Sequence, residues 1–216
     1  MDKLKASSKS HNSRYLNKAG KRVPGVTTFL GVLAKPALIS WANKLGLQGI
    51  DSTKYVDSLA GAGTCAHYLI ECHLKREKPI LDDFTQNQIE LAENSVLKFY
   101  EWEKNHELEV LGSELVLISE QYQYGLTIDL YCKLDGKKTL IDFKTGKAIY
   151  PEMTMQVAAY KHGLEENGYE VEDARILRIG RDETEGFEDR KLSNLDKGFE
   201  IFKHCISIYQ LQKELK

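Results

Sequence analysis

The chain has 216 residues, of which 42% are hydrophobic, 29% are charged and only 4 are proline. This length fits one domain, and the composition excludes both a collagen-like and a wholly disordered chain. No apolar run approaches the roughly 18 residues that a membrane span requires, so we expect no membrane partner.

The net charge of −2 is unevenly distributed. Residues 1–22 hold seven Lys or Arg and one acid, which gives +6 there and −8 in the remainder. Such a basic tail attracts phosphates, although a merely solubilising terminus explains it equally well. The four cysteines have neither zinc nor iron–sulfur spacing, so we expect reduced thiols in a cytoplasmic protein and no iron–sulfur cluster.

The first half of the chain is predicted to be helical behind a small hairpin. Residues 14–23 predict the hairpin, because Arg14-Tyr15-Leu16 and Lys21-Arg22-Val23 flank the turn residues Asn17 to Gly20. Gly61 and Gly63 indicate a break between two helices, with Thr64 capping the second. The predicted helices cover 27–34, 37–47, 52–60, 64–76 and 86–106.

The centre of the chain changes to the period of β-strands. Strands are predicted at 114–118, 126–133 and 139–144, and Asp135-Gly136 is a strong two-residue hairpin signal between the last two. A helix at 151–167, strands at 174–179 and 187–191, and a helix at 195–215 follow. We therefore predict a mixed α/β fold: a single domain over 23–216, with a helical front at 23–110 and an α/β core at 111–216.

The hairpin fixes a register between two acidic residues. With Asp135 and Gly136 in the turn, facing positions sum to 271, so Asp129 faces Asp142 in a close pair that is not hydrogen-bonded. Strand alternation places Lys144 on the same face, opposite Thr127, while Ile141 and Phe143 point into the core.

Two facing carboxylates repel each other unless a cation lies between them. A Mg²⁺ or Mn²⁺ ion prefers carboxylate oxygens and keeps water ligands that a phosphate can replace. The nearby ammonium of Lys144 is suited to steady charge that builds on a phosphoryl group. The alternative is an ordinary solvent-exposed strand face that carries polar residues.

Five segments together resemble the RecB-type nucleases of the PD-(D/E)XK superfamily, including the phage-encoded and mitochondrial genome maintenance exonucleases. They are Val23-Pro-Gly-Val-Thr-Thr28, Gly63-Thr-Cys-Ala-His67, Gly125-Leu-Thr-Ile-Asp129, Asp142-Phe-Lys-Thr-Gly146 and Gln156-Val-Ala-Ala-Tyr160. The resemblance implies a restriction-endonuclease-like core with a central mixed sheet flanked by helices.

The resemblance also implies roles for individual residues. Asp129 and Asp142 would be metal ligands and catalytic residues, and Lys144 would be the catalytic lysine. His67 and the backbone carbonyl of Phe143 would complete the ligand set.

Several further residues are expected to contact the substrate or the metal site. By the resemblance, Gln156 and Tyr160 would hold the scissile phosphate or the DNA strand, although a helix face packed on the core is the alternative. Glu114 resembles the family's upstream acidic residue, with a register that the sequence does not fix. Glu71, one turn after His67, is a candidate to hold the imidazole or a metal-bound water. Candidates for stacking on bases are Tyr122, Tyr124 and Tyr150.

We expect a Mg²⁺- or Mn²⁺-dependent DNA exonuclease that serves recombination, replication or repair in a bacterium or a phage-infected cell. Its substrate would be single-stranded DNA or DNA with a free end. Three alternatives remain: an endonuclease of the same fold, a module that binds DNA without cutting it, and a metal-binding protein without affinity for DNA.

Overall fold

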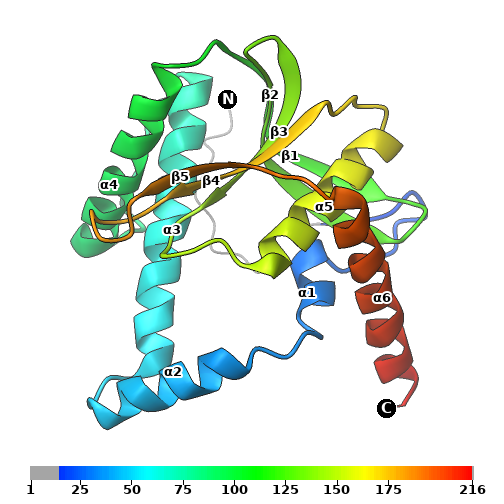
Figure 1. Ribbon diagram of the computed structural model, residues 1–216, viewed down its shortest axis with the longest axis horizontal. Helices are drawn as coiled ribbons and strands as arrows, with labels where there is room; N and C mark the ends of the chain where they lie inside the picture. The colour runs from blue at the N-terminus through cyan, green and yellow to red at the C-terminus, as the bar shows by residue number, and fades with distance from the viewer. Residues whose placement is uncertain (1–14, 216) are drawn as a thin grey trace.

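The computed structural model describes residues 15–215 and shows a mixed α/β fold, as predicted. Figure 1 shows the sheet in the centre with helices on both sides. The elements in chain order are α1 (Val26–Leu30), α2 (Pro36–Leu47), α3 (Ser52–Lys75), α4 (Gln86–Glu103), β1 (Leu108–Ser119), β2 (Tyr124–Leu134), β3 (Lys137–Lys144), α5 (Pro151–Glu166), β4 (Asp173–Ile179), β5 (Phe187–Lys191) and α6 (Leu195–Glu214).

The five strands form one sheet in the order β1-β2-β3-β4-β5. Only β3 and β4 run parallel, because helix α5 carries the chain back between them; the other neighbours are antiparallel. The β2–β3 turn is as predicted: Asp135 and Gly136 both have positive φ values, 48° and 85°, which a two-residue hairpin of this type requires.

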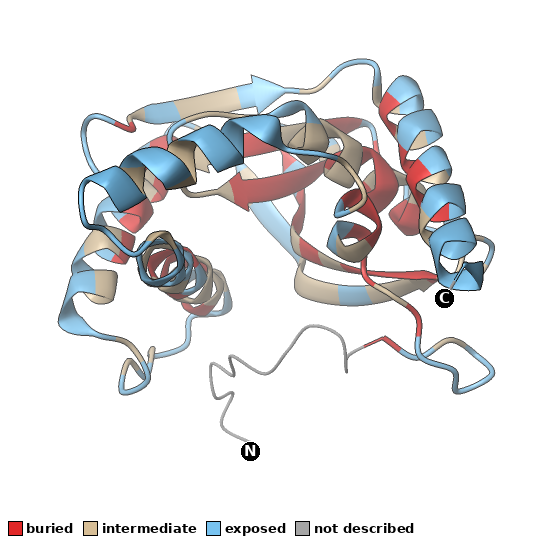
Figure 2. Cartoon of the chain, turned by 90° about the horizontal axis from the view of Figure 1, so that it is seen from below, coloured by how far each residue is buried: buried red, intermediate tan, exposed pale blue. Residues whose placement is uncertain are grey.

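Apolar side chains of neighbouring strand positions point to opposite faces and build two cores. Leu140 and Ile176 pack with α1, α5 and α6, whereas Ile141 and Leu177 pack with α3 and α4. The sheet is therefore covered on both faces. Figure 2 shows the buried residues gathered in the sheet and the helix faces that pack on it.

Helix α3 contradicts the predicted pair of helices, because it is a single helix of 24 residues. Thr64 does not cap a second helix; its hydroxyl donates to the carbonyl of Ala60 within α3. Gly63 lies against β3, where an added Cβ would come 2.7 Å from Thr145 Oγ1. Gly63 therefore serves close packing and not a helix end.

Several other boundaries differ from prediction. Strand β1 begins at Leu108, six residues before the predicted start, and its pairing with β2 shifts register between Val110 and Gly112. Helix α1 ends at Leu30, four residues early. The N-terminal hairpin is confirmed for its described part by a bridge between Leu16 and Arg22.

Helix α2 has no buried residue and lies apart from the sheet, between α1 and the lower end of α3 (Figure 1). Figure 2 shows it as exposed or intermediate along its length. No helix in the described part of the chain combines the length and apolar character needed to cross a membrane.

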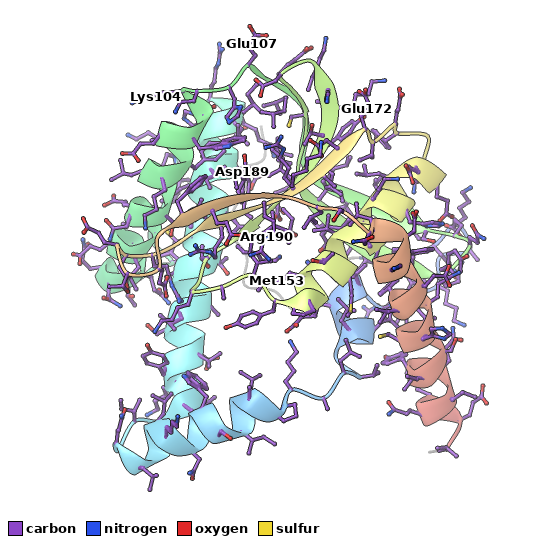
Figure 3. All side chains as sticks on the ribbon, in the orientation of Figure 1. Lys104, Glu107, Met153, Glu172, Asp189 and Arg190 are labelled. Carbon is purple, nitrogen blue, oxygen red and sulfur yellow. The ribbon has the colours of Figure 1, made fainter. Side chains whose placement is uncertain are left out.

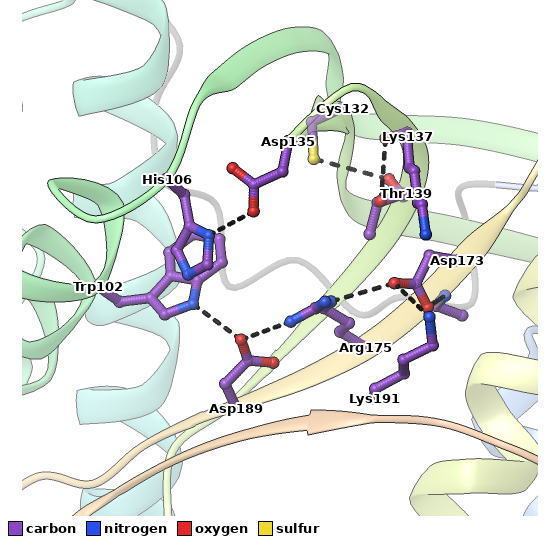
Figure 4. A network of polar contacts seen from close by, with 11 residues as sticks. Trp102, His106, Cys132, Asp135, Lys137, Thr139, Asp173, Arg175, Asp189 and Lys191 are labelled. Atoms are coloured by element: carbon purple, nitrogen blue, oxygen red, sulfur yellow. Dashed lines mark hydrogen bonds and ion pairs between the residues drawn. The ribbon is translucent and has the colours of Figure 1, made fainter.

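The end of the sheet that carries the β2–β3 turn is held by polar contacts (Figure 4). Trp102 of α4 and Arg175 of β4 both donate to Asp189 Oδ2, at 3.0 and 2.7 Å, and His106 contacts Asp135 at 2.7 Å. Figure 3 labels Lys104, Glu107 and Glu172 at this end, away from Met153 near the start of α5. The residues of chemical interest lie toward α5, at the other end of β3.

Candidate functional site

The central hairpin brings Asp129 and Asp142 together. The register is as predicted from the turn to the pair Leu130–Ile141, the last that the two strands form. One position further, β3 leaves β2, and the Phe143 N–H donates to Asp129 Oδ2 at 2.8 Å instead of to the main chain. The two carboxylates therefore lie where the sheet opens between α3 and α5.

Asp142 is almost completely buried, with 1% of its surface exposed. Lys144 Nζ lies 2.6 Å from its Oδ2 and forms an ion pair with it. The other oxygen, Oδ1, has no hydrogen-bond partner within the described residues. A buried carboxylate oxygen without a donor is costly, and such a group in a native protein usually serves a ligand or a reaction.

His67 reaches the site from α3. Its Nδ1 lies 3.4 Å from Asp129 Oδ1, and its ring stands edge-on to Phe143, with ring centres 5.8 Å apart. Gly63, one turn earlier on the helix, allows α3 to approach Thr145 closely. The close approach of this helix therefore sets the position of the imidazole.

Glu114 comes from β1, and the structure supplies the register that the sequence left open. Ser113 pairs with Leu130 and Leu115 with Ile128, so Glu114 stands opposite Asp129. Its φ of 49° lies in the left-handed region, which a non-glycine residue rarely adopts. Ligand atoms of Glu114, Asp129 and His67 all lie within 4.8 Å of one another, so this half-buried group could hold a metal ion.

The charges in the site shift one another's titration. Burial raises the pKa of Asp142 to about 6, and the neighbouring Asp129 adds to the rise while Lys144 opposes it. Burial would also raise the pKa of Asp129, but His67, Lys144 and the Phe143 N–H outweigh it and lower that pKa. The carboxylates raise the pKa of both His67 and Lys144 against the effect of burial.

Helix α5 contributes Gln156 and Tyr160, which are one turn apart. Gln156 Nε2 donates to the Tyr160 hydroxyl at 2.7 Å, and Tyr160 is 7% exposed. Burial, followed by the charges of Asp142, Asp129 and Tyr15, raises the pKa of Tyr160 well above its usual value. The Tyr160 side chain therefore lies within electrostatic reach of both carboxylates.

These residues suit a hard divalent cation. The donor set combines carboxylate oxygens with one imidazole nitrogen, which a divalent cation accepts. The buried Oδ1 of Asp142 fits the same ion, because coordination would satisfy it.

Some expected contacts are absent or different. Glu71 forms an ion pair with Lys75, one turn on, and not a contact with the imidazole. Tyr124 is fully buried and its hydroxyl donates to the Ala159 carbonyl, so the prediction that it stacks on bases is wrong. Tyr150 is 51% exposed and precedes α5, so it remains accessible.

Sequence reasoning missed Tyr15 and Arg178. The Tyr15 hydroxyl lies 2.8 Å from Thr127 Oγ1, across 112 positions of sequence. Arg178 donates to the carbonyl of Gly146, in the loop that follows Lys144. No local pattern signals either contact, because each joins segments far apart in the chain.

No protein family model matches the chain, and no curated protein matches it in sequence. Among solved structures, a crystal structure from Eubacterium rectale named "putative exonuclease" aligns with a TM-score of 0.52 and 14% sequence identity. The alignment covers 68% of this chain but only 64% of that one. At this identity the similarity shows a shared fold, which in this chain is a five-stranded mixed sheet with flanking helices.

Proposed function

We propose that the protein is a metal-dependent deoxyribonuclease of the RecB-type branch of the PD-(D/E)XK superfamily. One observation carries the proposal: Asp142 Oδ1 is buried without a hydrogen-bond donor from the described residues, while Oδ2 pairs with Lys144, and the residue lies next to the group His67, Glu114 and Asp129. A purely structural carboxylate would be hydrogen-bonded or exposed. The fold shared with a "putative exonuclease" agrees with this assignment.

In this proposal His67, Asp129, Asp142 and the Phe143 carbonyl hold Mg²⁺ or Mn²⁺, with Glu114 as a further carboxylate facing Asp129. When bound, the ion supplies Lewis acidity and lowers the pKa of water. The ligand residues bind and orient it. Phe143 has a second role, since its N–H fixes one Asp129 oxygen and leaves the other for His67 or a cation.

Lys144 is the proposed catalytic lysine. Its Nζ lies 2.6 Å from Asp142 Oδ2, and 18% of the lysine side chain is exposed. The ammonium can therefore turn from the carboxylate toward a phosphate oxygen. A fixed positive charge in a site of low water content stabilises the charge that develops during phosphoryl transfer. Gln156 and Tyr160 would hold the phosphate or the strand from α5, as hydrogen-bond donors.

The proposed substrate is DNA with a free end or in single-stranded form. Residues 23–110 would guide the strand to the core at 111–216, within one domain. The basic tail at 1–22, of which residues 1–14 lie outside the described part, would add attraction for phosphates. Two alternatives stay open, namely an endonuclease of the same fold and a module that binds DNA without cutting it.

End-labelled single- and double-stranded DNA, incubated with Mg²⁺ or Mn²⁺, tests the proposal together with a closed circular single strand. We expect progressive loss of the linear substrates, an intact circle, and no cleavage in EDTA. Cleavage of the circle would favour the endonuclease. Binding without cleavage would favour the DNA-binding module, and absence of both would refute the assignment.

A further inference from the structure

The first described residue of the chain, Tyr15, is fixed against strand β2 just before the candidate site. Its aromatic ring lies directly over Gly125, where an added Cβ would come 1.9 Å from the ring. The Gly125 N–H donates to the Pro24 carbonyl at 2.9 Å, and Gly25 forms a parallel bridge with Gly125. The N-terminal segment is thus held to β2 by backbone and side-chain contacts together.

The Tyr15 hydroxyl ends beside Thr127, 2.8 Å from its Oγ1. Tyr15 is 5% exposed, whereas Thr127 is half-buried. A threonine hydroxyl has one proton and two lone pairs, so Thr127 can accept a hydrogen bond from Tyr15 and donate its own proton to another acceptor. The tyrosine ring cannot move away from Gly125 easily, so it restricts the orientation of the threonine hydroxyl.

Thr127 precedes Asp129 by two positions on β2. Val116 pairs with Thr127, and by the same register Glu114 stands opposite Asp129. Residues two apart on a strand are about 7 Å apart along it. This step is similar to that between successive phosphates of a nucleic-acid strand, which a strand-binding groove follows.

We propose that Thr127 contacts the DNA phosphate next to the one being cleaved, and that Tyr15 is a positioning residue that orients the Thr127 hydroxyl. The inference rests on the proposed function. It adds a neutral phosphate subsite beside the charged residues that act on the scissile bond. The Tyr15 ring excludes any larger residue at position 125, which explains the glycine there in physical terms.

Thr127→Val and Tyr15→Phe each remove one hydroxyl group. Together with the double variant they form a double-mutant cycle. Each single variant should raise the KM for a short single-stranded DNA about tenfold, because Thr127→Val removes the hydrogen bond to the phosphate and Tyr15→Phe removes the contact that orients it. The kcat should be nearly unchanged, since the contact is made before and during the reaction. The double variant should be no worse than Thr127→Val alone, and Thr127→Ser should retain most of the wild-type KM.

Two further readouts separate this role from metal binding and from charge. Mn²⁺ affinity, measured by calorimetry, should be normal in all variants. DNA affinity, measured by fluorescence anisotropy in a Lys144→Ala background to prevent cleavage, should fall equally at every salt concentration. A neutral hydroxyl releases no counterion, so the slope of affinity against salt stays constant.

Matched controls come from the far end of the same hairpin. Tyr131→Phe removes a buried hydroxyl that donates to the Glu170 carbonyl, and Thr139→Val removes one that donates to the Lys137 carbonyl. Both should leave KM unchanged. An unchanged KM in Thr127→Val, or an equal rise in the controls, would overturn the inference. A wild-type protein that neither binds nor cuts DNA would instead refute the proposed function, and the inference with it.

Discussion

Substitution of Asp142 by Asn should stabilise the metal-free protein, although it removes a residue of the proposed site. Burial raises the pKa of Asp142 from 3.8 to about 6 in the folded protein. A difference of about two pKa units corresponds to roughly 3 kcal/mol of unfolding free energy. This is an upper bound, because Lys144 loses its ion-pair partner in the variant.

The size of the effect depends on pH. Below about pH 4 the carboxyl group is protonated in both the folded and the unfolded chain, so wild type and Asp142→Asn should differ little. Between pH 4 and 6 the unfolded chain ionises first, and the wild type loses stability relative to the variant. Above about pH 7 the difference should be constant and at its largest, with the variant more stable by up to ~3 kcal/mol.

Metal should reverse this order. An ion that binds only the folded wild type adds about 4.1 kcal/mol at a concentration of 1,000 times its Kd, which exceeds the advantage of the variant. The Asp142→Asn variant has lost one ligand, so it should gain much less. Urea unfolding of the wild type and the variant gives the free energy of unfolding of each protein in EDTA and in Mn²⁺, at pH 5 and at pH 8. The fluorescence of the buried Trp102 follows the transition.

Asp135→Asn is the matched control, because the fold lowers the pKa of Asp135 whereas it raises the pKa of Asp142. The hydrogen bonds from His106 and the Glu107 N–H lower the pKa of Asp135, and asparagine suits the same turn. This variant should lose stability at pH 8 and show no metal dependence of its own. If Asp142→Asn is clearly less stable than wild type in EDTA at pH 8, then Asp142 is a structural group and the reasoning fails.

Three further outcomes are expected. Gly63→Ala should weaken Mn²⁺ binding about tenfold by calorimetry, with DNA affinity nearly normal, because the new methyl group meets Thr145 Oγ1 and pushes the helix that carries the imidazole. Lys144→Ala should reduce the cleavage rate at least ~10²-fold while metal affinity stays normal, and Lys144→Arg should not restore the rate, because a broad guanidinium fork does not replace a compact ammonium. Burial raises the pKa of the Cys65 thiol to about 11 and that of Cys132 to about 12, so at pH 8 a thiol reagent should label neither until urea unfolds the chain.

Controls for these outcomes lie close at hand. Gly61→Ala meets only the flexible end of the Gln88 side chain and should bind Mn²⁺ normally. Lys138→Ala removes a lysine whose partner is Glu170, far from the site, and should cleave at the normal rate. Normal metal binding by Gly63→Ala, or normal cleavage by Lys144→Ala, would contradict the assigned roles.

Much of the fold follows from local sequence patterns. The Asp135-Gly136 turn specifies positive φ at both positions, and this turn fixes the register that brings Asp129 toward Asp142. Strand periodicity places Ile141 and Phe143 in the core, as predicted. These features depend on neighbouring residues, so the sequence contains the physical information that determines them.

The prediction for α3 failed because the same residue type serves two purposes. Glycine ends many helices, and Gly61 with Gly63 indicated a break on that basis. In the folded chain Gly63 instead allows the helix to approach Thr145. Packing against α4 and the close approach to Thr145 outweigh the small intrinsic preference of glycine against a helix, and a local pattern carries no sign of a neighbour 82 positions away.

The sequence by itself determined the strand hairpin, its register as far as Leu130 and Ile141, and the mixed α/β class, because turns and periodicity act over a few residues. The tertiary structure decided the position of Glu114 opposite Asp129, since the β1–β2 turn carries no strong register signal. It also decided the contact of Tyr15 with Thr127, which joins residues 112 positions apart. Such contacts arise only when apolar burial brings distant segments together, so no local pattern can specify them.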